Sequence, residues 1–171
     1  MRNVEIKARS SDPEPVRNIL VANRAEFIGT DSQTDTYFNV AEGRLKLRQG
    51  SIENHLIRYR RADKSGPKLS GVTLYKPGDA EVLKNILADA LGVKVVVVKV
   101  REIYFIDNVK FHIDRVDQLG GFVEIEVIDE HDEIPLDEMH RKCEYYIDLL
   151  NLNRDEFVKN SYSDLISDLK T

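Results

Sequence analysis

The chain has no tryptophan, a single cysteine and no long apolar run among its 171 residues. Cys143 alone cannot form an internal disulfide and cannot supply a thiolate metal site. Apolar runs such as residues 95–98 have the length of a strand and are too short to cross a bilayer. The first residues also lack the apolar stretch of a signal peptide. We therefore expect a cytoplasmic protein with no membrane partner.

The overall charge gives a further exclusion. The formal net charge is −5, which disfavours a protein dedicated to nucleic-acid binding. Hydrophobic residues make up 42% and charged residues 32%, as is typical of a soluble globular protein. With no repeat or linker in the chain, we expect one domain over residues 1–171. The charges are unevenly distributed along this domain, and their segregation carries the most information.

Strands dominate the expected secondary structure. Alternating polar and apolar residues, with turn residues between them, predict strands at residues 3–9, 34–40, 44–49, 54–61, 72–75, 94–107, 109–116 and 121–128. Helical spacing predicts helices at residues 12–23, 79–91, 136–150, 155–159 and 163–169. Asp79 and Gly92 have the residue types that begin and end the second of these helices. Consecutive strands with short turns predict an α+β protein whose antiparallel meander closes on itself.

Six of the strands each have one charged face, because side chains alternate between the two faces of a sheet. These faces carry Asn3, Glu5, Lys7 and Arg9; Arg44, Lys46 and Arg48; Arg58 and Arg60; Lys99 and Arg101; Lys110, His112 and Asp114; and Glu124 and Glu126. A one-sided sheet with a solvated outer face is one interpretation of this pattern. The other is a closed barrel whose charged faces point inward.

Two features favour the inward arrangement. The charges are sorted by strand, whereas a solvated face usually places opposite charges on neighbouring strands. The helices also need apolar sheet surface to pack on, and the faces opposite the charges supply it. Inward cations about 5 Å apart would repel by roughly 3 kcal/mol at an effective dielectric near 20, so such a lumen needs a polyanion. A triphosphate fits the cations, and the acids fit Mg²⁺ or Mn²⁺.

Several segments, in order along the chain, resemble the CYTH family, also called triphosphate tunnel metalloenzymes. They are Asn3-Val4-Glu5-Ile6-Lys7, Thr34-Asp35-Thr36-Tyr37-Phe38, Arg44-Leu45-Lys46-Leu47-Arg48, Val98-Lys99-Val100-Arg101, His112-Ile113-Asp114-Arg115-Val116 and Leu119-Gly120-Gly121-Phe122-Val123-Glu124-Ile125-Glu126. Residues 103–113 and the ending Ser161-Tyr162-Ser163-Asp164-Leu165 look most like the class IV adenylate cyclase subgroup. Asn3 is the main departure, because it stands where the family signature has its first acid. This change could weaken a second metal position or alter substrate choice.

The resemblance implies a barrel of about eight antiparallel strands that forms a tunnel, with helices outside. It implies a triphosphate-binding set of Lys7, Lys46, Arg48, Arg60, Lys68, Lys99 and Arg101. It also implies Glu5, Asp114, Glu124 and Glu126 as ligands for Mg²⁺ or Mn²⁺. Lys7 and Arg101 are the candidate catalytic residues. We expect Arg101→Ala to reduce turnover and leave the fold intact. His112, Asp35 and Tyr162 are expected to have structural roles.

Several functions remain open. The machinery could convert ATP to cyclic AMP and pyrophosphate, or hydrolyse inorganic, nucleoside or thiamine triphosphates. The lack of a tryptophan to stack on a thiazole ring disfavours thiamine triphosphate. A non-catalytic triphosphate or polyphosphate binder is an alternative motivated by Asn3, and an RNA 5′-triphosphatase is disfavoured by the acidic charge. The sequence leaves the oligomeric state open, including a homodimer.

Overall fold

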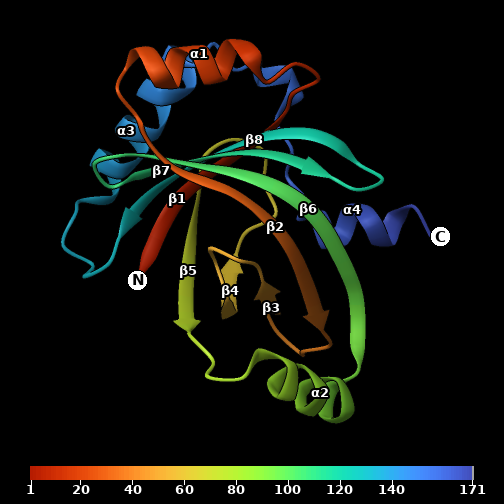
Figure 1. Cartoon of the computed structure of the whole chain (residues 1–171). Coiled ribbons are helices and arrows are strands. Elements are labelled where there is room, and N and C mark those ends of the chain that lie inside the picture. Colours follow the sequence, from red (N-terminus) through yellow and green to blue (C-terminus); the bar gives the residue numbers. More distant parts are fainter. Residues whose placement is uncertain (171) are drawn as a thin grey trace.

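Eight antiparallel strands close into a barrel around a polar lumen (Figure 1). The structure is a computed structural model and describes residues 1–170. The strands are β1 (Arg2–Arg9), β2 (Glu26–Phe38), β3 (Arg44–Gln49), β4 (His55–Arg61), β5 (Lys68–Tyr75), β6 (Val93–Ile106), β7 (Val109–Val116) and β8 (Gly120–Asp129). Around the barrel they follow the order β1-β5-β4-β3-β2-β6-β7-β8. The predicted closed antiparallel barrel with helices outside is confirmed.

The helices differ in how they meet the barrel. They are α1 (Glu14–Ala22), α2 (Ala80–Leu91), α3 (Leu136–Leu149) and α4 (Tyr162–Asp168), with a short 3-10 helix η1 (Arg154–Glu156) before the last. Figure 1 shows α1 and α3 together over the side formed by β7, β8 and β1. Outward residues of these strands, such as Phe111 and Ile125, pack there with Met139 and Cys143 of α3. This apolar layer is the main core, and it leaves the opposite faces of the strands to the lumen.

The helical cover is incomplete on the β2–β6 side. Helix α2 buries none of its residues, and the outward side chains of Val96, Val98 and Val100 on β6 are 43–50% exposed. The expectation that helices cover the apolar strand faces therefore applies to β1, β7 and β8 but not to β6. None of the described helices is long and apolar enough to cross a membrane.

Helix α4 closes one end of the barrel. Its Tyr162 and Ile166 pack against inward residues of β2 and β6, including Tyr37 and Val97. Ser161 begins the helix with a capping box that it forms with Asp164, which fixes the direction in which the chain enters the barrel end. Because this end is filled, access to the lumen is left at the other end, where β1 begins.

Two strands begin several residues earlier than predicted. β2 begins at Glu26 rather than residue 34, and β5 begins at Lys68 rather than residue 72. The extra part of β2 carries Asp31 and Gln33, which are buried in the lumen. Such a segment has no apolar face, so the alternation used to recognise strands is missing from it. The caps predicted for α2 are confirmed, since Asp79 accepts a hydrogen bond from the Val82 N–H and Gly92 follows the last turn with φ 74°.

Candidate functional site

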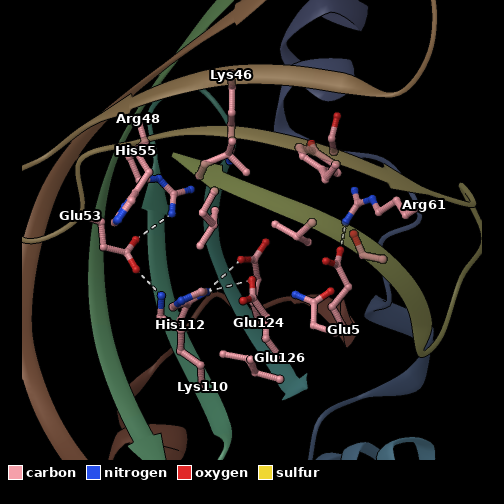
Figure 2. Close-up of a pocket in the computed structure, with 18 of the residues that line it drawn as sticks. Glu5, Lys46, Arg48, Glu53, His55, Arg61, Lys110, His112, Glu124 and Glu126 are labelled. Carbon is pink, nitrogen blue, oxygen red and sulfur yellow. Dashed lines mark hydrogen bonds and ion pairs between the residues drawn. The ribbon is translucent and has the colours of Figure 1, made fainter. Parts of the chain in front are cut away.

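The inward faces of the strands line a cavity of about 280 Å³. Its charged lining residues are Glu5, Lys7, Lys46, Arg48, Glu53, Arg61, Arg101, Lys110, Glu124, Glu126 and Glu130. Figure 2 shows many of these side chains pointing toward a shared space from different strands. The lumen therefore brings charges that lie far apart in the sequence into one partly buried site.

Asp35 is the centre of a buried cation cluster. Its carboxylate, which is fully buried, accepts hydrogen bonds from Lys46 Nζ at 2.8 Å, Lys99 Nζ at 2.7 Å and Arg48 Nε at 2.9 Å. Burial raises the pKa of Asp35, but Arg48, Lys46 and Lys99 outweigh it and hold the pKa well below its usual range. The expected structural role of Asp35 thus has an electrostatic basis, since this carboxylate offsets the repulsion among three cations.

Glu53 adds a second carboxylate to the same cluster. It accepts a hydrogen bond from Arg48 at 2.7 Å and another from Lys110, and Figure 2 shows it between them. Asp31 holds the loop that carries it, by accepting hydrogen bonds from the backbone N–H groups of residues 51–53. Sequence reasoning missed Glu53 because it lies in a turn outside the strand pattern. Four cations, Lys46, Arg48, Lys99 and Lys110, thus share two carboxylates.

The fourth strand points its arginines differently from the prediction. The strand alternation predicts Arg58 and Arg60 on the lumen side, but both are exposed, and Arg60 pairs with Glu42 at the surface. The inward arginine is Arg61, which forms an ion pair with Glu5. Register explains the error: Lys46 of β3 pairs with Ile57, so the odd-numbered residues of β4 share the inward face with Lys46. Arg60 is therefore absent from the lumen cluster.

An acidic group lies on the opposite wall, where β7 and β8 pair. Ligand atoms of His112, Glu124 and Glu126 all lie within 4.8 Å of one another. The register places His112 directly across from Glu124, while Glu126 lies one inward position further along β8. Glu124 also contacts Lys7 at 3.1 Å and Arg101 at 2.8 Å. Burial raises the pKa of Glu124, but Lys7 and Arg101 hold it well below its usual range.

This donor set fits a divalent cation. Two carboxylates and an imidazole nitrogen are ligands that Mn²⁺ and related ions accept, and the carboxylates also suit Mg²⁺. Burial and then Arg101 lower the pKa of His112, which favours the neutral ring that coordination requires. His112 Nδ1 lies 3.1 Å from Glu124, and its Nε2 is buried with no hydrogen-bond partner among the described residues. The ring therefore contacts Glu124, and the structural role expected for His112 stays a prediction.

Two of the four predicted metal ligands are engaged elsewhere. Asp114 accepts two hydrogen bonds from Arg101, and the Tyr162 hydroxyl donates to it at 2.8 Å. Glu5 lies across from Glu126 in the β1–β8 register, but it is paired with Arg61. Only Glu124 and Glu126 join the group that includes His112. The metal-binding roles of all four acids stay predictions.

The residues predicted to bind triphosphate lie at different depths, and only some of them line the cavity. Lys7 lines the cavity, and its Nζ lies 3.7 Å from the centre of the Tyr162 ring. Lys68 is turned to the closed end, where its Nζ donates to the backbone carbonyl oxygens of Lys159 at 3.1 Å and Val158 at 3.3 Å. Burial, with Arg61 and Lys7 nearby, lowers the pKa of Lys68 to about 7. Lys68 and Lys99 do not line the cavity directly.

A protein-family model for the CYTH domain matches residues 1–160. The chain belongs to the CYTH domain family. A relative from Methanocaldococcus jannaschii, named "Putative adenylate cyclase", is 29% identical over 183 aligned positions. That alignment covers 96% of this chain and 98% of the relative.

Solved structures show the same barrel as this CYTH domain. A protein of Pyrococcus horikoshii OT3 matches with a TM-score of 0.80 and 23% identity, over 95% of this chain and 98% of that one. A Hippeastrum protein titled a putative adenylyl cyclase matches with a TM-score of 0.60 and 14% identity, over 98% and 95% of the two chains. At these identities the likeness extends to the fold alone.

Proposed function

We propose that this CYTH protein is a Mg²⁺- or Mn²⁺-dependent enzyme that acts on triphosphate substrates inside the barrel. The main observation behind the proposal is that one cavity has two different walls. One wall has more cations than acids, and the other has the group of His112, Glu124 and Glu126. Membership of the CYTH family supports the proposal. So does the Hippeastrum neighbour, whose title reports a dominant triphosphatase activity for that protein.

The chain's own residues would act mainly by position and charge. Lys46 and Arg48 would bind phosphate oxygens, with Lys99 behind them setting the local potential. Lys7 and Arg101 contact Glu124, so they would lie beside a phosphate group bound to the proposed cation. Glu124 and Glu126 would hold the divalent cation, which supplies Lewis-acid polarisation of phosphate oxygens when bound. Fixed charges of this kind stabilise a phosphoryl transition state without reorganisation.

Two reactions share this machinery. Attack of water on the terminal phosphorus would make the protein a triphosphate phosphohydrolase. Attack of the ribose 3′-hydroxyl of ATP on the α-phosphorus would make it an adenylate cyclase, as the name of the Methanocaldococcus relative suggests for that protein. Incubation with Mn²⁺ or Mg²⁺ and ATP separates them, because only the cyclase releases cyclic AMP and pyrophosphate together. Orthophosphate release from ATP or tripolyphosphate identifies the hydrolase.

Glu124→Gln tests whether the site is catalytic. We expect turnover of the preferred triphosphate to fall by about a hundredfold or more, because the substitution removes a charge that sits between Lys7, Arg101 and the proposed cation. Glu133→Gln is the matched control, since Glu133 is an exposed acid beyond β8. Triphosphate binding with no turnover in the unaltered protein would instead support the non-catalytic binder.

Glu126→Gln tests the metal assignment separately. Glu126 makes only a 3.8 Å contact with His112 and is partly exposed, so its loss should disturb the fold little. We expect the Mn²⁺ concentration for half-maximal binding to rise by about tenfold or more, measured directly by calorimetry. An unchanged Mn²⁺ affinity would remove Glu126 from the ligand set.

A further inference from the structure

One section of the cavity lining is mainly apolar, and the proposed phosphate and metal sites leave it unused. Its apolar lining residues are Met1, Ile57, Val72, Leu74 and Ile128. Met1 is 37% exposed and Leu74 is 46% exposed, so this section forms the open mouth of the barrel. Lys7, Lys46 and Glu124 lie deeper, toward the end that α4 closes, while Glu130 lies beside Ile128 at the mouth. A substrate with its triphosphate in the charged section would therefore have its other group at this mouth.

Two buried polar groups in this section have no partner. Asn3 Oδ1 and Ser70 Oγ lack a hydrogen bond to any described residue, although Asn3 is 4% exposed and Ser70 is 1% exposed. The two residues are direct cross-strand partners on β1 and β5, so their side chains lie side by side. Both line the cavity. A buried polar group without a partner costs about 1–3 kcal/mol, which a ligand that bonds to it would recover.

The unpartnered groups continue along the same row of the barrel. Ser70 pairs with Arg61 of β4, whose Nε and Nη2 atoms are also buried without a partner. Ile128 flanks Asn3 on the other side. The row thus offers an acceptor at Asn3 and a hydroxyl at Ser70 beside the apolar residues of the mouth, and it runs inward to the charged Arg61, which is paired with Glu5. These groups complement an uncharged polar ring or sugar, and inorganic phosphate would leave Asn3 Oδ1 without a donor.

We propose that Asn3 and Ser70 form a subsite for the uncharged organic group of a nucleoside triphosphate. The proposal rests on the proposed action on triphosphates and names its substrate class. The side-chain amide of asparagine can accept a hydrogen bond from a ring amino group and donate to a ring nitrogen, a pairing typical of adenine. A carboxylate at position 3 would instead add a charge at the mouth. With Asn3 in place of a carboxylate, this position carries an uncharged side chain that can both donate and accept hydrogen bonds.

Binding without metal tests the subsite apart from turnover. The affinities of ATP and tripolyphosphate are measured by calorimetry in the presence of EDTA. Charge alone favours tripolyphosphate, because both of its ends are free and it carries the larger negative charge. We expect ATP to bind at least about tenfold more tightly, since its organic group satisfies the buried acceptor and covers apolar surface.

The variants assign that preference to named residues. Asn3→Leu, which keeps the size and removes the acceptor, should reduce the ratio of ATP to tripolyphosphate affinity by about tenfold. Ser70→Ala should reduce it in the same direction, and it carries the test if Asn3→Leu does not fold. Thr73→Ala, at an exposed outward position of β5, is the matched control.

Two results would overturn the subsite: tripolyphosphate binding as tightly as ATP, or an ATP preference that neither variant reduces. In both cases the proposed action on triphosphates would stand. If neither ligand binds in EDTA, the subsite fails, and if neither binds when Mn²⁺ is added, the proposed function fails as well.

Discussion

Asp35→Asn is expected to lower the free energy of unfolding by about 3–5 kcal/mol, because it leaves buried cations without their shared counter-ion. Asp35 is fully buried and bonded to Lys46, Arg48 and Lys99. For a chain of this size, such a loss should lower the melting temperature by on the order of 10 °C, measured by calorimetry or circular dichroism.

Tripolyphosphate should restore much of that loss. In the Asp35→Asn protein the cluster keeps Glu53 as its one nearby carboxylate, so a bound polyanion supplies the missing charge. The rise in melting temperature on adding tripolyphosphate should be larger for Asp35→Asn than for the unaltered protein. Asp63→Asn is the matched control, because Asp63 is a half-exposed partner of Arg44 and its loss should cost at most about 1 kcal/mol. A variant that melts like the unaltered protein would refute the cluster's dependence on Asp35.

Strand alternation predicted most of the lumen because the barrel is closed and each strand contributes every second residue. It placed Lys7, Lys46, Arg48 and Arg101 on inward faces, where the structure has them. It failed at β4, because Arg60 and Arg61 are adjacent and place a charge on each face of the strand. In that strand the register with β3 decides the orientation, and register is a property of the pairing rather than of one segment.

Counter-charges were harder to predict than cations. The expectation of a self-repelling lumen took no account of Asp35 and Glu53, one placed on a polar strand and the other on a turn. Asp35 lies in a predicted strand, but both faces of residues 34–38 mix polar and apolar side chains, so the pattern does not show which face points inward. A loop position such as that of Glu53 depends on contacts such as those of Asp31. The lumen still has excess positive charge near Lys46 and Arg48, but the excess is smaller than the sequence suggested.

Arg101→Ala is expected to impair stability as well as turnover, contrary to the sequence-based prediction of an intact fold. The side chain is 3% exposed and bridges the buried Asp114 and the partly buried Glu124. Its removal leaves these like charges close together, so the free energy of unfolding should fall by about 3–5 kcal/mol. Turnover of the triphosphate should fall by about a hundredfold or more, measured at a temperature where the variant is folded.

A cation rather than a polyanion should restore the stability of Arg101→Ala. Because Arg101→Ala leaves uncompensated carboxylates, Mn²⁺ should raise its melting temperature more than that of the unaltered protein, while tripolyphosphate should not. Asp35→Asn should show the reverse selectivity. Arg101→Lys keeps the charge but loses the paired contacts with Asp114. Its stability should therefore lie between that of Arg101→Ala and that of the unaltered protein. If one ligand raised the melting temperature of both variants equally, ligand binding would stabilise the lumen without regard to charge. The division into a cationic and an acidic wall would then be refuted.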